Sequence, residues 1–288
     1  MGFQIITADQ RLSEKKGHKI VICGQSGVGK TTLARTLGER TLFVDLEAGD
    51  SAIEGHPIDV MRPQSWPECR DLACYLGGPN PSLAEDQPYS QAHYDFLCAE
   101  EGDPTALVAK YDTLFVDSIT VAGRLCFSWC QQQPESRSDR TGKLDTRAAY
   151  GLHGREMMQW LTHLQHIREK NVIFVGILDE TTDDYSRKQY NLQIEGSKTG
   201  RELPGIVDEV ITMAILTGEN GPYRAFICQP LNEWGYPAKD RSGRLATLEE
   251  PHLGKLIDKM SSQLSANGKP LESCELILSI SLPKCGSS

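Results

Sequence analysis

The chain has 288 residues, of which 39% are hydrophobic and 24% are charged, an ordinary composition for one large α/β domain or two small ones. The net charge of -9 excludes a protein that coats nucleic acid by bulk charge, although it leaves room for a local basic loop. No apolar run approaches the roughly 18 residues of a membrane span, and Met1–Gln10 lacks the pattern of a secretory signal. We therefore expect a cytoplasmic protein, and its nine cysteines, which lack the spacing of a zinc site, are expected to be reduced thiols.

Apolar runs and helical spacings alternate along the chain. An N-terminal arm (1–16) precedes a buried strand at 19–23, a glycine-rich loop and a helix at 32–40. The segment 62–110, rich in proline, glycine and acidic residues, is expected to be the least regular part, and an amphipathic helix is expected at 153–170. Further strands are predicted at 41–44, 114–116, 172–178, 210–216 and 224–228.

These elements predict one α/β core over residues 17–248. Its sheet is mostly parallel and flanked by helices, and its last two strands form a C-terminal β-hairpin. The tail, 249–288, is predicted to contain a helix at 253–265, followed by an apolar stretch from Leu276 to Leu282 that adds an edge strand.

The eight residues after the first strand fit the phosphate-loop pattern G-x-x-x-x-G-K-[ST], with a strand before it and a helix after it. Backbone amides and the helix N-terminus surround phosphate oxygens in such a loop. Lys30 is expected to reach the β- and γ-phosphates, and Thr31 to give its hydroxyl to Mg²⁺. We therefore predict ATP and Mg²⁺ as ligands. The predicted nucleotide-binding residues are Gly24, Gln25, Ser26, Gly27, Val28, Gly29, Lys30, Thr31 and Thr32.

Three carboxylates follow predicted strands at positions suited to hydrolysis. Asp117 ends the strand at 114–116 in the Walker B arrangement, which predicts it as a second Mg²⁺ ligand. Asp45 and Glu47 follow the strand at 41–44. Because side chains alternate along an extended chain, both face the same side, and either is a candidate to activate the attacking water.

Four segments resemble the core of the RecA/RadA recombinases. They are the phosphate loop, Val44-Asp45-Leu46-Glu47, Phe115-Val116-Asp117-Ser118 and the stretch from Val172 to Leu216. The resemblance implies a RecA-like P-loop NTPase fold, ATP hydrolysis, and Glu47 as the catalytic base with Asp45 as its neighbour. The segments 150–160, 195–205 and 237–243 are similar to phage-encoded RecA-like ATPases of the single-strand annealing or recombination type. That likeness implies the cytoplasm of an infected bacterium.

The resemblance also gives a role to Lys239 and Arg241. RecA-like hexamers and filaments place a K-x-R pair across the subunit interface, where it stabilises charge on the neighbour's γ-phosphate. The pair precedes Gly243, so we expect it near a hairpin tip, with both cations on the same side of an extended segment. The alternative is a solvated basic turn.

One feature of the recombinases is missing. Their fourth strand ends in a polar pair that senses the γ-phosphate, whereas this chain has Gly176-Ile177 there. Asp179 and Glu180 are the candidate replacements.

RecA-like proteins contact DNA through two loops after the third and fourth core strands, which correspond here to about 133–150 and 180–205. Cations and carboxylates nearly balance in each segment, so the alternative is a pair of mobile polar loops. The predicted DNA contacts are Arg137, Arg140, Lys143, Arg147, Lys198 and Arg201.

The sequence therefore predicts an oligomeric ATPase, as a hexamer ring or a filament, that acts on single-stranded DNA in phage recombination or annealing. A single-strand-binding protein is a further expected partner. Two alternatives remain open. One is an ATP-driven motor or loader that acts on a protein, such as a helicase loader or packaging component, and the other is an ATP-dependent assembly switch.

Overall fold

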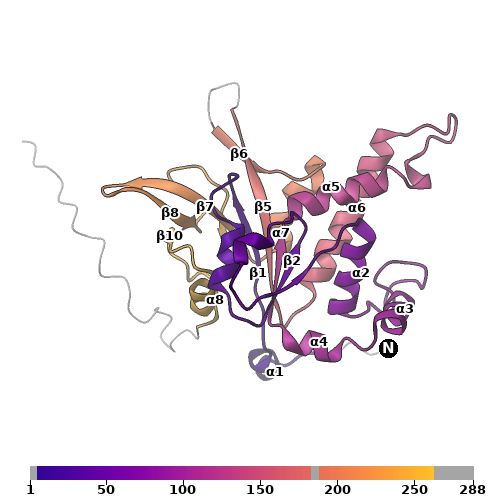
Figure 1. Ribbon diagram of the computed structural model, residues 1–288, viewed down its shortest axis with the longest axis horizontal. Helices are drawn as coiled ribbons and strands as arrows, with labels where there is room; N and C mark the ends of the chain where they lie inside the picture. The colour runs from indigo at the N-terminus through magenta and orange to yellow at the C-terminus, as the bar shows by residue number, and fades with distance from the viewer. Residues whose placement is uncertain (1–4, 183–187, 263–288) are drawn as a thin grey trace, which may run out of the picture.

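The computed structural model describes residues 5–182 and 188–262. Over these residues the chain forms a ten-stranded sheet whose main path has the order β10-β8-β7-β1-β5-β4-β2-β3, with β6 paired to β5 and β9 paired to β7 (Figure 1). The strands are β1 (Lys19–Gly24), β2 (Thr41–Asp45), β3 (Asp59–Met61), β4 (Thr113–Asp117), β5 (Asn171–Thr182), β6 (Lys188–Leu192), β7 (Glu209–Gly218), β8 (Gly221–Ile227), β9 (Lys239–Asp240) and β10 (Leu248–Glu249).

Helices cover both faces of this sheet. Figure 1 shows α2, α5 and α6 on one side of β1 and α8 on the other. The helices are α1 (Ala8–Ser13), α2 (Trp66–Gly77), α3 (Gln91–Glu101), α4 (Thr105–Lys110), α5 (Ile119–Cys130), α6 (Thr146–Gln165), α7 (Ser197–Ile206) and α8 (Leu253–Ser261), with 3₁₀ turns η1 (Thr31–Thr36), η2 (Asp50–Ile53) and η3 (Pro134–Ser136).

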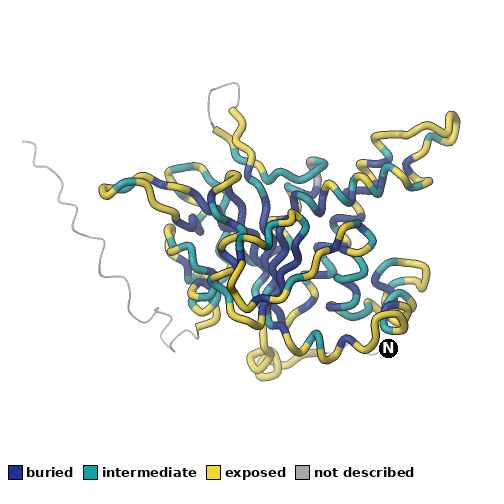
Figure 2. The backbone as a smooth tube through the Cα atoms, viewed as in Figure 1, coloured by how far each residue is buried: buried dark blue, intermediate teal, exposed yellow. Residues whose placement is uncertain are grey.

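The central strand β1 shows why the sheet needs two covered faces. All six of its residues are buried, as expected for a parallel strand between two layers of helices. Val21 and Cys23 join the core beneath α2, α5 and α6, whereas Ile20 and Ile22 join the core beneath η1 and α8. Figure 2 shows the strands as the buried centre of the molecule. The predicted fold, a mostly parallel α/β sheet with a C-terminal hairpin, is confirmed.

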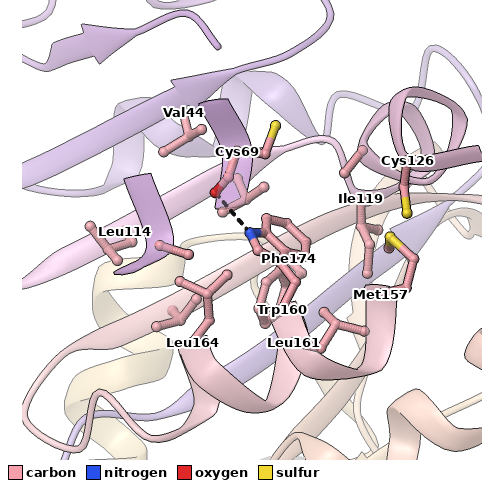
Figure 3. Packing of buried hydrophobic residues seen from close by; sticks show 14 of the residues in the cluster. Val44, Cys69, Leu114, Ile119, Cys126, Met157, Trp160, Leu161, Leu164 and Phe174 are labelled. Carbon is pink, nitrogen blue, oxygen red and sulfur yellow. Dashed lines mark hydrogen bonds between the residues drawn. The ribbon is translucent and has the colours of Figure 1, made fainter. Parts of the chain in front are cut away.

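The larger core centres on α6. The Trp160 indole lies against the Phe174 ring, with ring centroids 6.0 Å apart, and its Nε1 donates a hydrogen bond to the Cys69 carbonyl at 3.0 Å (Figure 3). Met157 and Leu161 on the same helix are fully buried. The helix predicted at 153–170 therefore exists, but it begins earlier, where the Asp145 carboxylate caps it, and ends at Gln165.

Two segments differ from the prediction. The segment 62–110 was expected to be irregular, yet it folds into α2, α3 and α4. Pro67 lies in the first turn of α2, where a missing amide hydrogen costs nothing, and Ser65 caps that helix. The helix predicted at 32–40 is instead the short 3₁₀ turn η1.

The described part of the tail, residues 249–262, packs on the core. Leu253, Leu256 and Met260 of α8 are buried against η1, and the Leu253 amide donates to the Thr36 hydroxyl at 2.9 Å. The helix predicted at 253–265 ends at Ser261. The edge strand predicted from Leu276 to Leu282 lies outside the described residues.

Candidate nucleotide-binding site

The phosphate loop begins where β1 ends, at the carboxyl edge of the parallel sheet. Gly27 and Gly29 adopt φ angles of 78° and 105°, which glycine reaches without the cost that a Cβ imposes. The Lys30 ammonium is buried and donates to the carbonyls of Gly24 and Gln25, at 2.9 Å each. Burial lowers the pKa of Lys30, and the nearby Asp117 carboxylate opposes that shift.

A cavity of about 350 Å³ opens above this loop. It brings together the loop and the ends of β4 and β5, in the way that ligands bind at the carboxyl ends of strands in open α/β sheets. Its lining residues are Ser26, Gly27, Gly29, Lys30, Thr31, Thr32, Glu47, Asp117, Ser118, Val175 and Ile177. Six of the nine predicted loop residues and two of the three predicted carboxylates therefore share one cavity, whereas Gly24, Gln25 and Val28 do not line it.

Asp117 has the features of a cation ligand. Its side chain is 1% exposed, and its Oδ2 is buried without a hydrogen-bond partner. Burial raises the pKa of Asp117 to about 6, against the opposing effect of the nearby Thr31 hydroxyl. Such an orphaned carboxylate oxygen is costly unless a cation pairs with it.

Space for a cation exists beside that oxygen. A Cβ on Gly49 would lie 3.3 Å from the Thr31 Cγ2 and 3.4 Å from the Asp117 Oδ2, so the glycine leaves open the gap between the two predicted ligands. No group of three or more His, Cys, Asp or Glu residues suited to a metal occurs in the described part of the chain. A Mg²⁺ ion here would fit the usual pattern of one carboxylate, with the remaining ligands drawn from phosphate and water.

Glu47 and Asp45 have different surroundings. The Ser118 hydroxyl donates a hydrogen bond to the Glu47 Oε1, and Glu47 is exposed to the cavity. Asp45 is buried and accepts hydrogen bonds from the backbone amides of Glu47, Gly49 and Asp50, at 3.2, 2.9 and 3.3 Å. Asp45 therefore shapes the turn after β2, whereas Glu47 is free to meet a water molecule.

Gly176 and Ile177, which stand where the recombinases have a polar γ-phosphate sensor, lie on β5 beside the phosphate loop. Ile177 and Val175 line the cavity, whereas a Cβ on Gly176 would meet the Leu192 side chain at 2.6 Å, so that residue faces the core. Of the two candidate replacements, Glu180 contacts the phosphate loop: its Oε2 accepts a hydrogen bond from the Gln25 side-chain Nε2 at 3.5 Å. Glu180 also forms an ion pair with Lys188 at 2.7 Å.

Lys239 and Arg241 lie at the opposite end of the sheet. Lys239 pairs with Val210, which is level with Val21 near the start of β1. The Lys239 ammonium donates to the carbonyls of Pro204 and Val207, at 2.6 and 2.7 Å. The expectation that Lys239 lies near a hairpin tip is therefore wrong. Lys239 begins strand β9, which pairs with β7, and its ammonium group caps the end of α7.

Arg241 forms an ion pair with Asp208 at 2.7 Å. The role of both cations across a subunit interface stays a prediction, which would require the exchange of these intramolecular contacts.

The two predicted DNA loops differ in structure. The first forms a small hairpin after α5, with Arg137 bridged to Leu144, and it projects beyond the helices in Figure 1. Its cations Arg137, Arg140 and Lys143 are exposed, as is Arg147 on the first turn of α6. The second segment was expected to be a loop, but Lys198 and Arg201 belong to helix α7.

Two residues of the site escaped the sequence analysis. Ser118 was seen only as the residue after Asp117, yet it both caps α5 and bonds Glu47. Gly49 was not considered, because a glycine in an acidic loop carries no signal of its own until its neighbours in space are known.

The sheet, the phosphate loop and the buried Asp117 define a P-loop nucleotide-binding protein. A family model described as AAA domain matches residues 16–242. The chain therefore belongs to the AAA domain family and is a P-loop ATPase.

A KaiC-like protein of the hyperthermophilic archaeon Pyrococcus horikoshii OT3 is similar in structure, with 15% identity, a TM-score of 0.36, and coverage of 74% of this chain and 78% of that chain. No curated protein matches the chain. Every helix within residues 5–182 and 188–262 is too short or too polar to cross a membrane.

Proposed function

We propose that this ATPase hydrolyses Mg-ATP with Glu47 as the general base. The observation that carries the proposal is the pair of carboxylates on one cavity: the orphaned oxygen of Asp117 and the exposed, oriented Glu47. A general base must lie within hydrogen-bond reach of the proton that it removes. Glu47 suits that role because it lines the cavity and, among the described residues, accepts a side-chain hydrogen bond only from the Ser118 hydroxyl, which engages one of its two carboxylate oxygens.

Each side chain then has one task. Lys30 exchanges its two carbonyl partners for phosphate oxygens of the nucleotide, and the loop amides hold the same phosphates. Thr31 and Asp117 would hold the divalent cation, which neutralises phosphate charge during transfer. Glu47 takes the proton from the water that attacks the γ-phosphate, and Ser118 fixes the direction of its carboxylate.

The test compares Lys30→Ala with Glu47→Gln. We expect Lys30→Ala to abolish nucleotide binding, and Glu47→Gln to keep binding while hydrolysis falls by about a hundredfold or more, the usual effect of losing a general base. Binding is followed with a fluorescent ATP analogue and hydrolysis by phosphate release. Normal turnover in Glu47→Gln would remove Glu47 from the role of base and direct attention to Glu180.

We further propose that single-stranded DNA stimulates this hydrolysis through the hairpin after α5. The supporting observation is that its exposed cations outnumber its uncommitted carboxylates: Asp145 is occupied in capping α6, with bonds to the amides of Arg147 and Ala148 at 3.0 and 3.2 Å. Binding that neutralises phosphates with such cations weakens as salt rises. Self-assembly, and the choice between ring and filament, stays a prediction.

Hydrolysis is measured with and without single-stranded DNA at two salt concentrations. We expect stimulation that fades with salt and that is lost in the triple variant Arg137→Gln, Arg140→Gln, Lys143→Gln. A matched control removes three exposed cations elsewhere, with Arg11→Gln, Lys16→Gln and Arg155→Gln. Equal stimulation in both triple variants would refute the role of the hairpin. No stimulation of the wild type would favour a loader or motor acting on a protein, and ATP-induced oligomers with negligible turnover would favour an assembly switch.

A further inference from the structure

Arg224 lies beside the phosphate loop, on a strand that does not line the cavity. It is on β8, directly opposite Ile215 of β7. The position that a Cβ on Gly29 would take lies 3.6 Å from the Arg224 Nε and 3.8 Å from its Cζ. Gly29 directly precedes Lys30, so the guanidinium rests on the outer wall of the loop that holds the phosphates.

The guanidinium of Arg224 has no other task in the described parts of the chain. Its side chain is exposed, and it forms no ion pair or hydrogen bond with residues 5–182 or 188–262. Other cations close to the site are occupied: Arg62 pairs with Asp50, and Lys188 pairs with Glu180. An arginine without a carboxylate partner beside an anion-binding loop is suited to bind phosphate, since its fork of donors matches phosphate oxygens.

The charge of the cavity also calls for a second cation. Its lining contains the cation of Lys30 and the two carboxylates of Glu47 and Asp117. A polyphosphate adds more negative charge, only part of which a divalent cation removes. Arg224 supplies positive charge beside the phosphate loop, next to Gly29.

The sheet order decides which phosphates Arg224 meets. Asp117 ends β4 and Glu47 follows β2. These two strands lie on one side of β1 in the sheet, whereas β7 and β8 lie on the other side (Figure 1). The γ-phosphate must lie toward the carboxylates that hold the cation and activate the water. The α-phosphate and the nucleoside therefore leave the loop on the side of β8.

We propose that Arg224 binds the α- and β-phosphates of the nucleotide within its own chain. The proposal rests on the assignment of nucleotide hydrolysis to this site and names the residue that holds the leaving diphosphate. The proposal makes Arg224 a binding residue for both ADP and ATP. Arg224 would thus differ from an arginine that acts on the γ-phosphate from a neighbouring subunit.

The test measures the Kd of ADP and ATP for the wild type, Arg224→Gln and Arg224→Lys. We expect Arg224→Gln to raise both Kd values by about tenfold, as the loss of a charge-assisted hydrogen bond would, and to raise KM while kcat stays close to wild type. Arg224→Lys should recover part of the affinity. The difference between wild type and Arg224→Gln should shrink as salt rises, because the guanidinium is exposed. Arg11→Gln, an exposed arginine on α1, is the control for charge, and thermal midpoints confirm that the variants fold.

Four results would overturn the proposal. Unchanged Kd values in Arg224→Gln would show that the guanidinium does not meet the nucleotide. A loss of ATP affinity without loss of ADP affinity would move its contact to the γ-phosphate, and a fall in kcat at unchanged Kd would make it a group for the transition state. Failure of the wild type to bind either nucleotide would instead refute the function of the site, and the Arg224 proposal with it.

Discussion

Gly49 controls the space between Thr31 and Asp117, and its replacement by alanine tests the cation site. The backbone of Gly49 has φ -94° and ψ 1°, a conformation that alanine can adopt. Alanine restricts the unfolded chain, which favours the native state by about 0.4–1 kcal/mol, and the tight 3.3 Å contact of its Cβ with the Thr31 Cγ2 opposes that gain. The net change in stability should therefore be small. The variant is therefore expected to fold.

The added methyl group should nevertheless weaken cation binding. Magnesium binds oxygen at about 2.0–2.1 Å and keeps several of its waters, so an ion on the Asp117 Oδ2 with one water beyond it needs about 4 Å. The methyl would lie 3.4 Å from that oxygen. Displacing one water-mediated contact of a charged group costs about 1.5 kcal/mol, which corresponds to about a tenfold higher Mg²⁺ concentration for half-maximal nucleotide binding.

The assay titrates Mg²⁺ at fixed nucleotide and follows binding by calorimetry, with hydrolysis as a second measurement. Gly38→Ala is the matched control, because a Cβ there meets nothing within 4 Å. If Gly49→Ala and Gly38→Ala respond to Mg²⁺ as the wild type does, the cation does not occupy the gap between Thr31 and Asp117.

Three further predictions concern orientation, packing and pH. Ser118→Ala should lower kcat by about tenfold with little change in KM, because Glu47 loses the one side-chain hydrogen bond that it accepts within residues 5–182 and 188–262. An unchanged kcat would contradict the orienting role. Trp66→Phe should lower the free energy of unfolding by about 2–3 kcal/mol, measured with urea. The change leaves a cavity and breaks the 2.9 Å hydrogen bond from the Trp66 Nε1 to the buried Glu156. A decrease below about 1 kcal/mol would mean that the core repacks around the smaller side chain. Burial, with the nearby Asp240 charge, raises the pKa of Glu209 to about 8 from its usual 4.5. The native state therefore binds more protons than the unfolded state between these values, and stability should fall as pH rises from about 5 to 8. Glu209→Gln should flatten this dependence in urea midpoints at pH 5, 7 and 9, and an unaltered slope would refute the assignment.

The nucleotide site was the most predictable part of the molecule. The phosphate loop is a local pattern, and the buried strands on either side of it fix where Lys30 and Thr31 lie. Asp117 could be placed because a buried parallel strand delivers its last residue to the same edge of the sheet as β1. The preference for Glu47 over Asp45 came from resemblance alone, since the two lie two residues apart at the end of β2 and only their contacts in the folded chain distinguish them.

The features that were missed depend on contacts between distant segments. β3, β9 and β10 contain three, two and two residues, too few for a periodic pattern to show. The basic pair at Lys239 and Arg241 was placed by analogy, and the sequence does not reveal that α7 and Asp208 occupy both cations. Arg224 and Gly29 come together only because β8 joins the sheet two strands from β1.

The burial of β1 has a consequence for amide hydrogen exchange. β1 is paired with β5 along one edge and β7 along the other, and neither face reaches solvent. Its amides should exchange only when the whole domain opens, whereas those of Gln25 and Ser26, exposed in the next turn, should exchange within the native state. A boundary between slowly and rapidly exchanging amides therefore falls at Gly24, where the buried strand gives way to the exposed phosphate loop.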